Sequence, residues 1–62
     1  MTGYKVMVNE IIITETGEID MMCVEYTGEI HYSYKNALIE LHRAKCNTSY
    51  YNAYLKEVDV DA

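Results

Sequence analysis

The 62-residue sequence contains no Pro, Trp or Phe and only three Gly. Because Pro and Gly interrupt regular structure, their scarcity predicts helices and strands joined by short connections. Half of the residues are apolar, which argues against a disordered chain. We expect one small domain over residues 1–62, and a domain of this size buries only about 60% of its unfolded surface.

Long apolar runs are also missing, since none reaches the roughly 20 residues of a membrane-spanning helix. The N-terminal segment "MTGYKVMV" lacks the basic start and long apolar centre of a secretion signal. The two cysteines, Cys23 and Cys46, form no C-x-x-C pair, and a lone disulfide is uncommon in a reducing compartment. The sequence therefore predicts a cytoplasmic protein with free thiols and no membrane association.

Positive charge is absent from Val6 to Tyr34, a stretch that contains six acidic residues. The net charge is −5, although residues 35–45 carry a local excess of +2. Direct binding to nucleic acid requires clustered Lys and Arg, so we expect none. A basic protein partner fits this charge pattern, and the alternative is that the acidic residues only keep a small protein soluble.

Two strands are predicted at residues 4–14 and 19–26, where β-branched and other apolar residues are frequent. The apolar side of the first strand switches near Asn9 and Glu10. This switch predicts either a β-bulge there or a central strand covered on both faces. The tetrapeptide "TGEI" occurs twice, and we assign Gly17 to a hairpin turn and Gly28 to a second turn or a strand kink.

A helix is predicted at residues 34–45, with Ser33 as its N-cap. Its apolar stripe is Tyr34, Ala37, Leu38, Leu41 and Ala44, and its solvent-facing side is Asn36, Glu40 and Arg43. A last strand is predicted at residues 50–61. Simple alternation places one set of side chains, Tyr51, Ala53 and Leu55, on one face and another set, Tyr54, Val58 and Val60, on the other.

These elements define an α+β fold, a two-layer β-β-(β)-α-β arrangement with a small mixed or antiparallel sheet and one helix on one face. If Ile30–Tyr32 forms a separate strand, the last strand can run parallel to the first. If Ile30–Tyr32 only leads into the helix, the last strand runs antiparallel to the first. In both cases the second face of the sheet has no covering layer, so a partner or a second copy of the chain is expected to cover it.

No catalytic signature is present, and the serines lack a G-x-S-x-G context. The set Cys23, His31, His42 and Cys46 matches the ligand count of a zinc site, and a zinc-stabilised mini-domain is one hypothesis. The spacing of these residues differs from that of zinc knuckles, however, because Cys23 and His31 are eight residues apart. We therefore expect no enzymatic activity, no metal and no cofactor.

All seven aromatic residues are tyrosines, which are enriched in protein interfaces. We expect Tyr32, Tyr50 and Tyr54 to be the most exposed. The carboxylates of Glu57 and Asp59 project from one side of the last strand and can imitate the charges of nucleic acid, unless this end is only a solvated terminus. The predicted partner-binding residues are Glu18, Asp20, Glu25, Glu29, Tyr32, Tyr50, Tyr54, Glu57 and Asp59.

The hairpin start, the helix "SYKNALIELHRAK", the Tyr-rich strand "YYNAYLKEV" and the acidic balance together resemble small acidic accessory proteins of bacteriophages and mobile elements. These include anti-CRISPR and other anti-defence inhibitors. The resemblance implies a stoichiometric inhibitor or adaptor of a basic, nucleic-acid-handling protein. The alternative hypothesis is a structural or regulatory homodimer that assembles through the bare sheet face.

Overall fold

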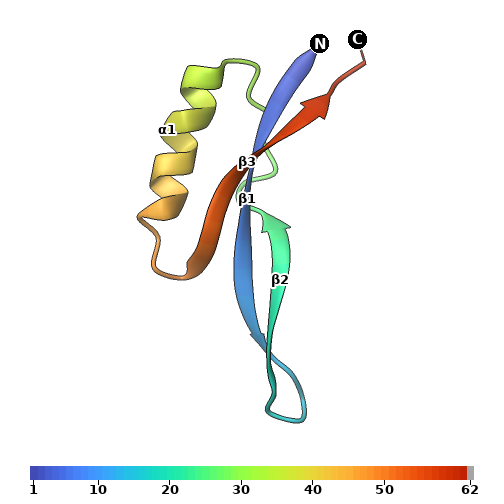
Figure 1. Ribbon diagram of the computed structural model, residues 1–62, viewed down its shortest axis with the longest axis vertical. Helices are drawn as coiled ribbons and strands as arrows, with labels where there is room; N and C mark the ends of the chain where they lie inside the picture. Colours follow the sequence, from blue (N-terminus) through green and yellow to red (C-terminus); the bar gives the residue numbers. More distant parts are fainter. Residues whose placement is uncertain (62) are drawn as a thin grey trace.

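The computed structural model describes residues 1–61 and confirms a small α+β fold (Figure 1). The elements follow the order β1 (Thr2–Ile13), β2 (Ile19–Glu25), α1 (Tyr34–Lys45) and β3 (Tyr50–Asp59). The three strands form one antiparallel sheet in the order β2-β1-β3, so β1 is the central strand. The helix covers one face of this sheet, and the elements thus form two layers.

The hairpin of β1 and β2 has a regular register, with Val8 opposite Val24 and Ile13 opposite Ile19. At its turn the amide of Gly17 donates to the carbonyl of Thr14 at 2.9 Å, and Gly17 has a φ of 83°. A φ in this range favours glycine, because other side chains are strained there. The predicted hairpin turn is therefore confirmed.

The segment Ile30–Tyr32 leads into the helix and is not a separate strand. Only His31 pairs with the sheet, through an isolated antiparallel bridge to Tyr4. The last strand accordingly runs antiparallel to β1, as expected for a lead-in segment.

The β-bulge lies on β3 and not at Asn9–Glu10 of the first strand. Between the pairs Met7–Tyr54 and Asn9–Tyr51, β3 has one residue more than β1, and Asn52 in this interval has a φ of 51°. A bulge shifts the alternation of a strand by one residue. The sequence-based assignment is therefore wrong on this point: Tyr50, and not Tyr51, shares the helix-covered face with Ala53 and Leu55.

We expect Asn52→Val to lower the free energy of unfolding by about 1–2 kcal/mol, because a β-branched side chain is strained in the left-handed conformation. The matched control is Asn52→Gly, which we expect to change stability by less than about 0.5 kcal/mol. Urea unfolding followed by circular dichroism measures both variants. Equal stability of the two variants would contradict the left-handed conformation of Asn52.

The core between helix and sheet consists of small side chains. Val6, Val8, Ala37 and Ala44 are each at most 2% exposed, and they are the only buried hydrophobic residues among residues 1–61. Larger half-buried side chains complete the core, namely Val24, Tyr26, Leu41, Tyr50, Ala53 and Leu55. The helix contributes only two alanines and Leu41 to this core. Burial of their apolar area therefore stabilises the packing of α1 on the sheet only modestly.

The hairpin extends beyond the two-layer part of the molecule (Figure 1). Helix α1 contacts β1 and β3 but not β2 within residues 1–61. The pairing of β1 with β3 ends at Glu10 and Tyr50, so the remaining residues of β1 pair with β2 alone. We call residues 11–21 the hairpin arm.

The helix α1 lacks the length and apolar character that a membrane-crossing helix requires, and no other helix occurs in residues 1–61.

Candidate functional site

Glu40 is a buried carboxylate on the sheet-facing side of the helix. It is only 8% exposed and lies in the buried stripe between Ala37 and Ala44. The sequence-based assignment of Glu40 to the solvent-facing side is therefore wrong. Two flanking alanines leave room for a longer side chain to reach beneath the helix.

Two residues predicted in the apolar stripe of the helix are exposed instead. Leu38 is 41% exposed and Tyr34 is 55% exposed.

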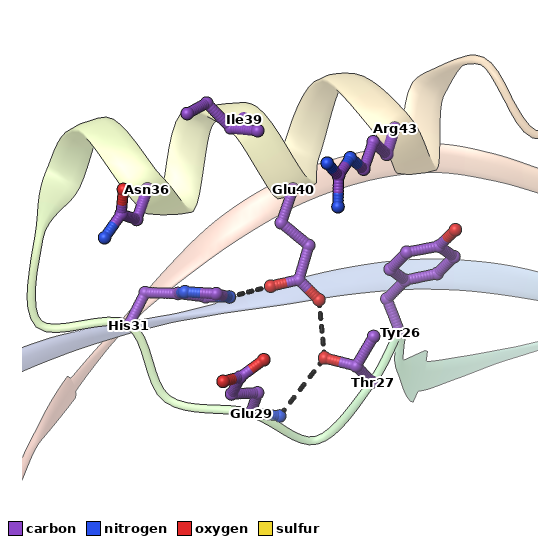
Figure 2. Close-up of a pocket in the computed structure, with 8 residues that line it drawn as sticks. All are labelled: Tyr26, Thr27, Glu29, His31, Asn36, Ile39, Glu40 and Arg43. Atoms are coloured by element: carbon purple, nitrogen blue, oxygen red, sulfur yellow. Dashed lines mark hydrogen bonds and ion pairs between the residues drawn. The ribbon is translucent and has the colours of Figure 1, made fainter.

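Two side chains from the segment between β2 and α1 compensate the buried carboxylate of Glu40 (Figure 2). The hydroxyl of Thr27 donates to Oε1 of Glu40 at 2.5 Å, and the imidazole of His31 forms an ion pair with Oε2. Such partners are required, because an uncompensated buried charge is strongly destabilising. The pairing joins residues that are nine or more positions apart, so neither helix periodicity nor strand alternation could reveal it.

The main chain holds His31 in place. Its amide donates to the carbonyl of Tyr4, and its carbonyl accepts from the amide of Tyr4, both at 2.8 Å. This bridge ties the loop to the central strand and directs the imidazole toward the helix. The segment before it contains Gly28 with a φ of 77°, a conformation that favours glycine.

Glu29 completes a cluster with His31 and Glu40. Each of these three residues offers one ligand atom, and the atoms all lie within 4.8 Å of one another. Figure 2 shows the side chains of Glu29, His31 and Glu40 close together. They line one open pocket of about 500 Å³, together with Asn36, Ile39 and Arg43. One imidazole and two carboxylates can coordinate a divalent cation or exchange a proton.

The four residues of the hypothetical zinc site lie in three different places. His31 faces Glu40, Cys23 contacts the hydroxyl of Tyr54, and His42 lies 3.7 Å from Cys46 on the helix flank. Both cysteines are free and exposed. The structure therefore does not assemble these four side chains around one ion.

The residues predicted to bind a partner are spread over the molecule. Glu18 and Asp20 lie on the hairpin arm, whereas Glu57 and Asp59 lie toward the other end of the sheet, opposite the start of β1. Glu29 lines the cavity, and Glu25 is engaged in a 2.6 Å ion pair with Lys5. The acidic residues thus form no single patch.

Two of the three tyrosines predicted to be exposed are so. Tyr32 is 55% exposed and Tyr54 is 43% exposed. Tyr50 is instead half-buried against the core, with its ring 5.6 Å from that of Tyr26 in an edge-on arrangement. The prediction for Tyr50 is wrong because the bulge at Asn52 turns this side chain toward the helix.

The helix-free face of the sheet carries a row of exposed apolar side chains. On the hairpin arm Ile11 is 42%, Ile13 72%, Ile19 74% and Met21 53% exposed. Ile11 is paired with Met21 and Ile13 with Ile19, so the four side chains adjoin on the same face. Tyr51 and Tyr54 continue this surface across β1 onto β3. The sequence predicted one sheet face without a covering layer, and these exposed side chains lie on it.

On the same face the hydroxyl of Tyr54 lies 3.0 Å from the sulfur of Cys23. The pKa of Tyr54 is raised above its ordinary value of 10.0, first because of this hydrogen bond and then because of desolvation and the nearby thiolate charge. The folded chain therefore retains this proton at a pH where the unfolded chain has lost it. The resulting stabilisation is present below pH 10 and is lost as the pH rises through the raised pKa.

We expect Cys23→Ala to lower the pKa of Tyr54, because it removes both the hydrogen bond and the thiolate. Ultraviolet absorbance of tyrosinate during an alkaline titration measures this change. The Tyr54→Phe variant identifies the contribution of Tyr54 among the seven tyrosines. An identical titration curve with and without Cys23 would contradict the interaction.

Known protein families, characterised proteins and solved structures include no significant match to this chain at the thresholds of the comparison. The fold and the surface of the chain itself are therefore the basis for a functional proposal.

Proposed function

We propose that this chain is a non-enzymatic protein-binding module that docks through its hairpin arm onto a basic protein. The observation that carries the proposal is the composition of the arm, which combines exposed apolar residues with acidic residues and contains no Lys or Arg.

The apolar part of the arm supplies the contact area. Ile13 and Ile19 are both more than 70% exposed and lie opposite each other. Monomeric proteins rarely leave such side chains adjoining in water, and exposed apolar patches of this kind commonly mark interaction sites. A two-stranded ribbon is also only marginally stable alone, so docking on a partner would stabilise it.

The acidic part of the arm selects the charge of the partner. Glu15, Glu18 and Asp20 are all exposed, and the nearest cation before them in the sequence is Lys5, which is paired with Glu25. Glu15 and Glu18 lie at the turn and Asp20 on the second face of the arm, and this negative charge favours a basic partner and accelerates association. The resemblance to anti-defence proteins points to a partner that handles nucleic acid, which the module would inhibit by occupying its basic surface.

The same apolar face supports a second candidate, a homodimer. Continuation of the surface onto Tyr51 and Tyr54 provides a broad area for a second copy. The charge opposes this candidate, because each copy carries −5 and the acidic arms would approach each other. For this reason we favour a basic partner.

Capture of proteins from a bacterial lysate, at low and at high salt, tests the proposal. We expect the immobilised chain to retain basic nucleic-acid-binding proteins at low salt and to lose them at high salt. Combined substitutions E18K and D20K on the arm should abolish this capture. The matched control is E57K with D59K, which makes the same charge change away from the arm and should preserve capture.

Equal loss in both double variants would indicate a general charge effect and would contradict docking through the arm. No captured protein, together with a dimer in sedimentation velocity that Ile13→Ser disrupts, would instead establish the homodimer.

A further inference from the structure

We propose that Glu29, His31 and Glu40 form a binding site for one divalent transition-metal ion, with Zn²⁺ as the expected occupant. This inference does not depend on the proposed function, because the cluster lies between loop and helix and not on the hairpin arm (Figures 1 and 2).

The three side chains have the chemistry of metal ligands. One imidazole nitrogen and two carboxylate oxygens lie within 4.8 Å of one another, a spacing that small side-chain movements can close around an ion. Zn²⁺ accepts both imidazole and carboxylate ligands, whereas Ca²⁺ and Mg²⁺ prefer oxygen alone. With a neutral imidazole the ligands carry a charge of −2, which a divalent ion neutralises.

Two of these ligand atoms are buried. The carboxylate of Glu40 belongs to a residue that is only 8% exposed, and it points into the cluster. Among residues 1–61, Oε2 of Glu40 and Nε2 of His31 face each other and neither has a further hydrogen-bond partner. In the metal-free chain these two atoms are partners of each other alone, and a metal ion would replace the proton between them.

Neighbouring groups hold the ligands in place. Thr27 donates to Oε1 of Glu40 and accepts a hydrogen bond from the backbone amide of Glu29 at 3.3 Å, so it orients the Glu40 carboxylate and fixes the main chain at Glu29. The backbone of His31 is fixed on the central strand by its two bonds to Tyr4. Such outer partners are characteristic of metal sites, because they hold the ligands in a binding orientation.

The remaining positions around the ion would be open to water, because the cluster faces the cavity. Arg43 also lines this cavity, and its positive charge opposes a cation there. Three protein ligands with a competing cation predict a site of moderate affinity. The consequence of binding would be structural, since the ion would attach the loop that precedes α1 to a helix whose core contacts are mostly alanine.

Zn²⁺ titrated into the chelator-treated 62-residue chain tests the proposal, with isothermal titration calorimetry and the melting temperature as readouts. We expect one ion per chain and a higher melting temperature, because a ligand that binds only the folded state stabilises it. Glu29→Gln removes an exposed ligand without disturbing the core and is the main variant. We expect it to weaken binding by about 10–100-fold or more.

Arg43→Gln removes the competing cation and should tighten binding. The matched control is H42A with C46S, which removes the other imidazole and thiol pair on the helix and should leave affinity unchanged. Co²⁺ substitution adds an independent readout, since the spectrum should show nitrogen and oxygen ligands without a thiolate charge-transfer band.

Absence of Zn²⁺ binding in the native chain would overturn the proposal. Full affinity in Glu29→Gln would also overturn it, as would loss of affinity in the H42A and C46S control or a thiolate band with Co²⁺.

Discussion

His31→Ala is expected to lower the free energy of unfolding of the metal-free chain by about 3 kcal/mol or more, because it leaves the buried carboxylate of Glu40 without its ion-pair partner. Only the hydroxyl of Thr27 would then compensate this charge. A domain of this length is stabilised by about 3–9 kcal/mol in total, so the expected loss is about a third of that stability or more. Urea unfolding in the presence of a chelator measures the change.

Combined replacement of both partners is the informative control. In the H31L and E40M double variant no buried charge remains, and such replacements by apolar residues of similar volume are often neutral or stabilising. We therefore expect much of the stability lost in His31→Ala to return. The single variants H31L and E40M complete the comparison. If the double variant loses as much free energy of unfolding as these two single variants together, the ion pair is not the cause of the loss.

Gly3→Ala is expected to lower the free energy of unfolding by about 1–3 kcal/mol through overpacking. A Cβ at this buried position would lie 2.5 Å from Cγ2 of Ile30 and 3.5 Å from Cγ2 of both Val58 and Val60. Ile30 is stiff at χ1 and precedes His31, whose backbone is bonded to Tyr4, so it cannot easily move away. Position 3 therefore favours glycine because a larger residue lacks space there. The backbone φ of Gly3 is not in the left-handed region.

A double-mutant cycle with Ile30→Ala separates this steric effect from a general effect of the substitution. In the Ile30→Ala background the added methyl group has room, so Gly3→Ala should cost less than in the native chain. Thermal and urea unfolding of the four proteins measure the coupling. Strict additivity of the two changes would contradict the contact between Gly3 and Ile30.

Local signals along the chain were sufficient for much of the fold. The apolar stripe and Ser33 predicted the helix at Tyr34–Lys45, and the hydroxyl of Ser33 does accept the amide of Asn36 at 3.4 Å. Gly17 predicted the hairpin turn, and the bare sheet face followed from having one helix for one sheet. These features depend on residues close in sequence, so periodicity and turn chemistry reveal them.

The bulge shows where local signals fail. A bulge depends on how two strands align, and β3 alone contains no residue that requires it, since Asn52 only tolerates a positive φ. The single extra residue exchanged the faces of Tyr50 and Tyr51. One of the three tyrosines expected at the surface was consequently placed against the core.

The candidate metal site shows the same limit more clearly. A Glu in a helix is normally assigned to water, and only contact with His31 and Thr27 from a preceding loop makes its burial tolerable. Short-range patterns along these 62 residues therefore define the hairpin, the helix and the acidic surface. Contacts between distant segments decide which side of β3 faces the helix. They also decide which three polar side chains meet between the helix and the preceding loop. Both features depend on the packing of complete elements and not on the preferences of single residues.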